Sequence, residues 1–295
     1  MSKNITLAKF AGFCYGVKRA VETVKKLKEE NKDKNVYVLG ELIHNSQVIK
    51  ELDELGIETV DELPKNETGI CVIRSHGASP EVIEQIKNQG FEVVDLTCPD
   101  VKKVQQQAIQ LAQEDNFVVI VGKAEHPEVV AIKANAEQFT SNIAVATDIE
   151  ELKSVEDAIK KNKKVGVVVQ TTQRIETLQN ILSYLTTITK EIHLVNTICA
   201  STSMRQKEAK ELAQTNDLVI VVGSKKSANT THLAEILTGI TNTIHIETAE
   251  ELDNYKDLIY NSKNIAITAG ASTPQNLIDN VYKKIEGGQE WQKHN

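Results

Sequence analysis

Short apolar runs alternate with amphipathic stretches along the whole chain. Apolar runs that end in polar turns predict buried strands, and stretches with apolar residues every three or four positions predict helices. The first such helix carries an apolar face made of Val17, Val21, Val24 and Leu27 and is followed by the strand VYVLG. This alternation is typical of an α/β fold.

The pattern occurs three times. Cys98 and Cys199 are 101 positions apart, and the sequences that follow them align at the same offset without a gap. LAQEDNFVVIVG (111–122) therefore aligns with LAQTNDLVIVVG (212–223). A first copy begins at Cys14 and has a slightly longer loop. Each copy reads as cysteine, amphipathic helix, loop, buried strand and glycine, which predicts three similar α/β units.

The second half of each unit carries a further helix and strand, except in the third. FEVVDL leads to Cys98 and EIHLV leads to Cys199, but the last helix is followed only by GGQEWQKHN (287–295), which carries no strand. The spare strand NITLAKF (4–10) stands at the other end of the chain. We therefore expect three α/β domains around a pseudo-threefold axis, with the cysteines facing one another across it; the expected units are residues 14–97, 98–198 and 199–295, the last completed by residues 1–13.

Polar residues gather where the predicted strands end. Matching positions after the three glycines, and after the strands CVIRSHG, VGVVVQTT and NIAITAGAS, hold His44, Ser46, His76, His126, Glu128, Thr171, Ser227, Asn229 and Ser272. In open α/β sheets, ligands bind outside the carboxyl ends of the parallel strands. These loops are therefore the predicted binding site.

Three cysteines at equivalent strand ends predict a threefold thiolate site. A helix N-terminus favours the thiolate form, and thiolates select zinc, copper(I) or an iron–sulfur cluster. The sequence lacks the paired C-x-x-C elements of structural zinc sites and the close-spaced ferredoxin motif. Three ligands to a four-iron cluster leave one iron open to substrate, which is a catalytic arrangement. Cys71 matches no repeat position and is interpreted as a core residue.

The remaining candidates point to an anionic substrate. Histidine, serine and asparagine side chains beside helix N-termini suit a phosphate or diphosphate, and no G-x-x-x-x-G-K-[ST] loop is present. Glu128 is the only carboxylate at the repeat positions, so it is the candidate for proton transfer, although alone it would be an ordinary helix-start residue. Ser227 and Asn229 alone could be helix caps. The histidines outside the pattern are interpreted as structural or solvated: His193, His232, His245 and His294.

Composition narrows the class of protein. The 295 residues are 40% apolar and 4% aromatic, carry a net charge of −7, and contain no apolar window long enough to span a membrane. We therefore expect a cytoplasmic protein that acts on a small molecule, with no nucleic-acid or membrane partner.

The motifs GFCYGVKRAV, RSHGASP, DLTCPDVKKV, GKAEHPEV, NTICASTSMRQ, GSKKSAN and TAGASTP resemble the 4-hydroxy-3-methylbut-2-enyl diphosphate reductase (LytB) family over essentially the whole chain. The resemblance implies one oxygen-sensitive [4Fe-4S] cluster per subunit on Cys14, Cys98 and Cys199. It also implies reductive removal of an allylic hydroxyl to give isopentenyl and dimethylallyl diphosphates, the last step of the methylerythritol phosphate pathway, with ferredoxin or flavodoxin as electron donor.

The resemblance also implies a role for each site residue. The diphosphate would be bound by His44, His76, His126, Ser227, Asn229 and Ser272. Thr171 would bind near the substrate hydroxyl, Glu128 would supply the proton, and His126 would belong to the catalytic group as well. The family often has a second serine where this chain has Ala228.

Two other classes compete with the reductase. An enzyme resembling quinolinate synthase would also place three cysteines around a cluster but would need no external electrons, and its motifs do not match. A non-enzymatic zinc or iron–sulfur sensor would need a closed fourth ligand and no Glu128.

Overall fold

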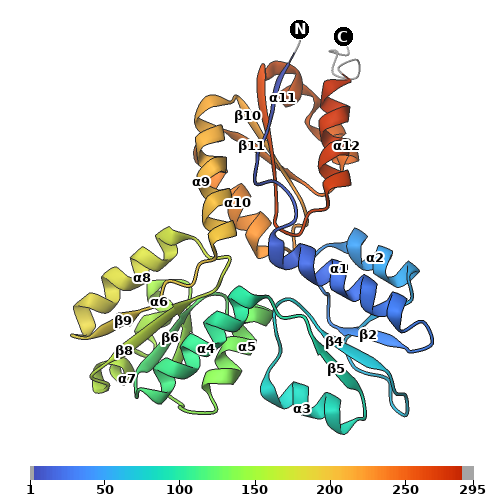
Figure 1. Cartoon of the computed structure of the whole chain (residues 1–295). Helices are drawn as coiled ribbons and strands as arrows, with labels where there is room; N and C mark the ends of the chain where they lie inside the picture. Colours follow the sequence, from blue (N-terminus) through green and yellow to red (C-terminus); the bar gives the residue numbers. More distant parts are fainter. Residues whose placement is uncertain (1–2, 288–295) are drawn as a thin grey trace. The chain divides into compact units, whose positions relative to one another are not determined.

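The computed structural model describes residues 3–287 and contains three four-stranded parallel sheets (Figure 1). The α/β class with three similar sheets is therefore confirmed. The stretch 287–295, expected to carry no strand, lies outside the described residues from position 288 onward.

The first sheet has the strand order β3-β2-β4-β5. Its strands are β2 (Val36–Leu39), β3 (Ile57–Val60), β4 (Ile70–Ile73) and β5 (Glu92–Asp95), and the helices of this stretch of chain are α1 (Tyr15–Glu30), α2 (Ser46–Glu54) and α3 (Pro80–Asn88). The core beneath α3 consists of Tyr37, Cys71, Ile73, Ile86 and Phe91. Cys71 is fully buried there, as its interpretation as a core residue requires.

The second sheet has the order β7-β6-β8-β9. Its strands are β6 (Phe117–Val121), β7 (Ile143–Ala146), β8 (Val165–Val169) and β9 (Ile192–Leu194), and its helices are α4 (Pro99–Gln113), α5 (Pro127–Ala136), α6 (Ile149–Lys153), α7 (Glu156–Lys161) and α8 (Ile175–Ile188). Along β6, Val118 and Ile120 pack under α4 and α5, whereas Val119 and Val121 pack under α8. Since both faces are covered, the strand is apolar at every position.

The third sheet has the order β1-β12-β10-β11 and joins the two ends of the described chain. Its strands are β1 (Asn4–Leu7), β10 (Leu218–Val222), β11 (Asn242–Ile246) and β12 (Asn264–Ala269), and its helices are α9 (Ala200–Thr215), α10 (Ala228–Thr238), the 3₁₀ helix η1 (Ala249–Tyr255), α11 (Lys256–Asn261) and α12 (Gln275–Glu286). β1 pairs in parallel with β12, with Asn4 opposite Asn264. The N-terminal strand therefore lies in the same sheet as the strands of the last repeat.

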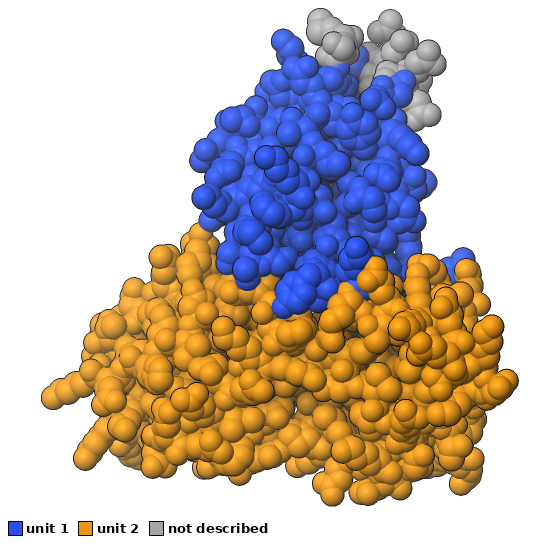
Figure 2. Space-filling view, viewed as in Figure 1, with its two compact units in different colours: residues 1–18, 44–50, 200–295 blue, residues 19–43, 51–199 orange. Residues whose placement is uncertain are grey.

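Two compact units contain these sheets (Figure 2). One consists of residues 1–18, 44–50 and 200–295 and contains the third sheet; the other consists of residues 19–43 and 51–199 and contains the first two. The three-domain boundaries expected from the repeat stay a prediction. Among residues 3–287, no helix has the length and apolar character needed to cross a membrane.

Candidate functional site

The three repeat-related cysteines stand in the same local structure. Each follows a strand at one edge of its sheet, precedes a helix, and is a half-buried cysteine outside any disulfide. Each also donates its backbone N–H to a carbonyl two residues beyond the end of the neighbouring strand: Cys14 to Ala271 (3.1 Å), Cys98 to Ser75 (3.0 Å) and Cys199 to Thr171 (3.0 Å). The repeat therefore reproduces the backbone support of each thiol.

Glu128 is the buried carboxyl group of the second sheet. It lies in the first turn of α5, is 1% exposed, and accepts from Thr171 twice, from the backbone N–H (2.7 Å) and from Oγ1 (2.8 Å). Burial raises the pKa of Glu128 to about 7, because desolvation of the charged form outweighs the two bonds from Thr171, which lower it. A group with this pKa is partly protonated near neutral pH.

Two imidazoles lie beside this carboxyl group. His126 precedes α5, and its Nδ1 accepts from the backbone N–H of Glu128 (3.2 Å), so Nε2 is the nitrogen that can donate. The ring of His76, in the loop after β4, lies edge-to-face with that of His126 at a centroid distance of 5.5 Å. Two donors suited to an anion therefore adjoin an acid.

These contacts join two cysteines within residues 19–43 and 51–199. Thr171, which binds Glu128, also accepts the N–H of Cys199, while Ser75, which accepts the N–H of Cys98, is the neighbour of His76. The predicted acid and both histidines therefore lie among the residues that support Cys98 and Cys199. The structure brings together these sequence-predicted residues of the unit: His76, Cys98, His126, Glu128, Thr171 and Cys199.

The other predicted residues belong to the unit that holds the third sheet. Ser272 Oγ donates to the carbonyl of His44 (3.4 Å), and Cys14 donates to the neighbouring Ala271. Ser227 precedes α10 and is 6% exposed, and Asn229 is 4% exposed. Among the described residues, Asn229 Nδ2 is buried without a hydrogen-bond partner, which is what a donor to an absent ligand looks like.

Close packing holds α10 against the end of β12. A Cβ atom on Gly270 would stand 1.9 Å from Thr230 Oγ1, so only glycine allows this approach. Thr273 Oγ1 also bonds to the carbonyl of Val222 at the end of β10 (3.0 Å). The start of α10, with Asn229, is therefore fixed against the strand end that leads to Ser272.

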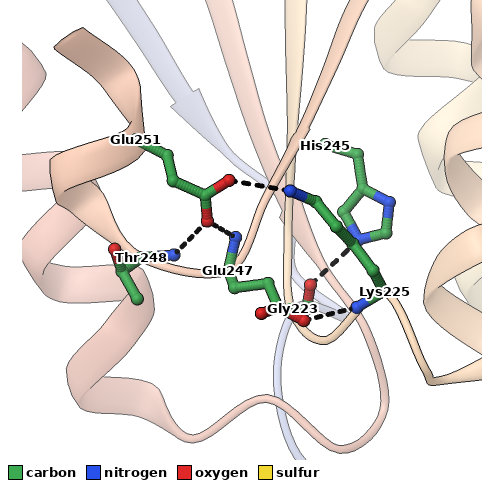
Figure 3. Close-up of polar contacts among 6 residues, drawn as sticks. All are labelled: Gly223, Lys225, His245, Glu247, Thr248 and Glu251. Carbon is green, nitrogen blue, oxygen red and sulfur yellow. Dashed lines mark hydrogen bonds and ion pairs between the residues drawn. The ribbon is translucent and has the colours of Figure 1, made fainter. Parts of the chain in front are cut away.

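A polar network supports the loop between β10 and α10 (Figure 3). Lys225 Nζ pairs with Glu251 (2.8 Å), the Lys225 N–H donates to Glu247 (2.7 Å), and the Glu247 N–H donates back to Glu251 (2.7 Å). His245 Nε2 bonds to the carbonyl of Gly223 (2.9 Å), which confirms its interpretation as a structural histidine. The loop that carries Ser227 is thus anchored to the segment after β11.

The structure corrects the repeat alignment of the first unit by one residue. In each of the equivalent helices, the first helical hydrogen bond is accepted by the carbonyl of the residue just before the helix. These bonds run from Ile49 to Asn45, from Val130 to His126 and from Thr231 to Ser227. Asn45, and not His44, is therefore the counterpart of His126, because the loop after Gly40 is one residue longer. Its Oδ1 caps α2 by accepting from Gln47 and Val48, and the Asn-Ser-Gln sequence is the signal that could have shown this.

Sequence reasoning missed one buried group at the site. Gln170 is fully buried at the end of β8; its Oε1 accepts from the Lys123 N–H (3.2 Å) and its Nε2 donates to Thr172 Oγ1 (3.1 Å). It therefore fixes the loop that leads to His126. The only signal was its place in the polar turn QTTQ, next to Thr171.

The comparisons with known proteins agree with one another. The sequence model of the LytB protein family matches residues 5–286. The chain is 41% identical to the 4-hydroxy-3-methylbut-2-enyl diphosphate reductase of Geobacter sulfurreducens, over 96% of this chain and 97% of that one, and 39% identical to that of Aquifex aeolicus, over 96% of each.

Solved structures give the same result. A structure of (E)-4-hydroxy-3-methyl-but-2-enyl diphosphate reductase, described as the terminal enzyme of the non-mevalonate pathway, is 38% identical with a TM-score of 0.71, over 97% of this chain and 99% of that one. The Plasmodium falciparum reductase is 27% identical with a TM-score of 0.84, over 95% and 86%.

Proposed function

The chain belongs to the LytB family of 4-hydroxy-3-methylbut-2-enyl diphosphate reductases, and we propose that it binds one [4Fe-4S] cluster and reduces that allylic diphosphate to isopentenyl and dimethylallyl diphosphates. The family makes it an oxidoreductase of the non-mevalonate pathway. Each turnover consumes two electrons and two protons, breaks the allylic C–O bond, forms a C–H bond and releases the hydroxyl group as water.

The donor set fits an iron–sulfur cluster. Three half-buried cysteines outside any disulfide stand at helix starts, each with its backbone N–H bonded in the same way: Cys14, Cys98 and Cys199. Thiolates in that setting are suitable iron ligands. When bound, the cluster supplies electrons one at a time and an iron that has no cysteine ligand. Ferredoxin or flavodoxin is the proposed external electron donor.

The observation that carries the proposal is the buried carboxyl group of Glu128. Its buried carboxyl group, with a pKa raised to about 7, holds a proton at a pH where an exposed glutamate has none. Thr171 fixes the orientation of this group through two hydrogen bonds. Glu128 is therefore the proposed general acid that protonates the leaving hydroxyl group, with Thr171 near that hydroxyl.

The anionic end of the substrate is assigned to the histidine, serine and asparagine donors. His76 and His126 offer imidazole nitrogens, and Asn229 offers a buried amide N–H that has no acceptor within residues 3–287. We assign the remaining diphosphate contacts to His44, Ser227 and Ser272. The N-termini of α5 and α10 add backbone donors and the positive ends of two helix dipoles.

Anaerobic purification followed by iron and sulfide analysis tests the cluster. The proposal expects about four irons per chain and broad visible absorption. It also expects that the chain oxidises a reduced viologen dye only when the allylic diphosphate is added. A colourless protein with stoichiometric zinc, isolated from iron-fed cells, would instead support the non-enzymatic alternative.

A further inference from the structure

Helix α9 holds the loop that leads to Cys14. Arg205, on this helix, is 3% exposed and donates from Nη1 to the carbonyl of Ala269 (2.9 Å) and from Nη2 to the carbonyl of Gly12 (3.0 Å). Ala269 is the last residue of β12, and Gly12 stands two residues before Cys14. The guanidinium group of Arg205 therefore links the loop just before Cys14 to the end of β12.

Glu208 holds the other end of the same loop. It lies three residues after Arg205, and its two carboxylate oxygens accept from the backbone N–H groups of Lys9 (2.8 Å) and Phe10 (2.9 Å). Arg205 therefore supplies donors to the end of the loop near Cys14, and Glu208 supplies acceptors to its beginning. Charge-assisted hydrogen bonds of this kind are stronger than neutral ones, so the loop is held at two separate points.

The loop itself is shaped to accept this support. Gly12 has φ +91°, a backbone conformation that other residues rarely adopt, and a Cβ there would stand 3.2 Å from Ile278 Cδ1. This turn presents the Gly12 carbonyl to Arg205. The chain then reaches Cys14, whose N–H bonds to Ala271.

A second arginine does the same for Cys98. Arg19, on α1 and five residues after Cys14, donates from Nη2 to the carbonyls of Leu96 (3.0 Å) and Thr97 (2.7 Å), which directly precede Cys98. The same use of an arginine side chain at two cysteines, from two different helices, indicates that the backbone before a thiol needs fixing from outside its own loop.

We propose that Arg205 and Glu208 are positioning residues for Cys14: they fix its loop before the cluster is loaded and slow the loss of iron afterwards. The second part rests on the proposed function, because it requires the cluster. The first part concerns the cluster-free chain alone, so the two are tested separately.

The cluster-free full chain gives the first test. In Arg205→Ala, we expect the backbone N–H of Cys14 to exchange with deuterium at least about tenfold faster than in the wild type, because the Gly12 and Ala269 carbonyls lose their shared donor. Iodoacetamide should also alkylate Cys14 at least about fivefold faster, with Cys98 in the same molecule as internal reference. Arg205→Lys, which keeps one charged donor, should recover part of the effect.

Matched controls lie on the exposed side of the same helix. Lys207 and Glu211 are exposed and form no hydrogen bond or ion pair with the Cys14 loop among the described residues. Lys207→Ala and Glu211→Gln should therefore leave exchange and alkylation unchanged. Glu208→Gln keeps one acceptor oxygen and should raise both rates about two- to threefold. If Arg205→Ala does not fold, as judged by circular dichroism, Glu208→Gln decides the question.

The loaded protein gives the second test. The Arg205→Ala variant should lose iron to a chelator several-fold faster than the wild type, and the EPR spectrum of its reduced cluster should differ. Folded Arg205→Ala and Glu208→Gln variants with wild-type exchange and alkylation at Cys14 would overturn the positioning role. A wild-type chain that binds no cluster would overturn the proposed function, yet leave the first test intact.

Discussion

The loops after β6 and β10 occupy equivalent places in the second and third sheets but are stabilised by different chemistry. Both begin at a glycine whose N–H bonds to the next strand, Gly122 to Ala146 and Gly223 to Ile246. After β6 the support is internal: the fully buried Gln170 and the hydroxyl group of Thr171 bind the loop and the helix that follows it. After β10, the loop is held by a partly exposed ion pair and its neighbours, while the helix that follows is packed against Gly270.

This difference decides what each loop can do. Glu128 and Asn229 both stand two residues after the N-cap residue of their helix, which is His126 for α5 and Ser227 for α10. A carboxyl group buried with only neutral donors has a raised pKa and can carry a proton, whereas a buried amide without a partner can only bind. The proposed function thus uses one repeated backbone position for proton transfer in one sheet and for anion binding in another.

The largest expected effect comes from removing the acid. Glu128→Gln keeps the shape of the side chain but cannot donate a proton, so we expect kcat to fall by at least about a hundredfold, within the range of general acid catalysis. Iron content and visible spectrum should stay at wild-type values. The measurement is dye oxidation under saturating substrate, together with iron analysis.

Glu125→Gln is the matched control for that substitution. Glu125 lies in the same loop but is exposed, so kcat should change by less than about twofold. A Glu128→Gln variant with normal turnover would remove the functional difference between the two loops. It would also return the sensor alternative to consideration.

The pH dependence of the reaction sharpens the same contrast. The acid must be protonated to act, and the pKa of Glu128 is raised to about 7, so kcat/KM should fall about tenfold per pH unit above pH 7. A glutamate with an ordinary pKa would produce that fall near pH 4.5. The decline should persist in Asn229→Ala and vanish in Glu128→Gln; a decline in every variant would belong to the substrate.

Much of the fold could be predicted from the sequence because its signals are local. The repeat identified the strand ends that carry the cysteines, and it identified the N-terminal strand that pairs with β12. The edge strands β3, β7 and β11 went unrecognised. All three are only partly buried; β3 (IETV) and β11 (NTIHI) carry no continuous apolar run, and the apolar run of β7 (IAVA) is only four residues long.

The site was predicted less completely, because its contacts join distant parts of the chain. The sequence showed that a carboxyl group stands at this repeat position, but it did not show that Glu128 is bonded to Thr171, 43 positions away. The bond from Arg205 to Gly12 spans 193 positions and follows no periodicity. The one-residue shift at Asn45 shows that a fixed offset fails wherever a loop changes length.

A substitution at Asn229 tests the binding half of the comparison. Asn229→Asp replaces a donor by a negative charge facing the anionic substrate, so KM should rise at least about tenfold with kcat within about threefold of the wild type. Asn229→Ala should raise KM less. Asn280→Asp, on the exposed side of α12, is the control and should leave KM unchanged; a normal KM in Asn229→Asp would exclude the assigned contact.

The smallest expected effect concerns the external support of the β10 loop. Lys225 and Glu251 are 56% and 28% exposed, and an ion pair of that kind contributes at most about 1 kcal/mol. Lys225→Met should therefore raise KM about two- to threefold without changing kcat, because the loop that carries Ser227 becomes less ordered. The double variant Lys225→Met, Glu251→Gln should raise KM little more than either substitution does alone. Salt near 0.5 M should shrink the difference from the wild type, since the pair is screened; a tenfold rise in KM would mean that Lys225 itself contacts the substrate.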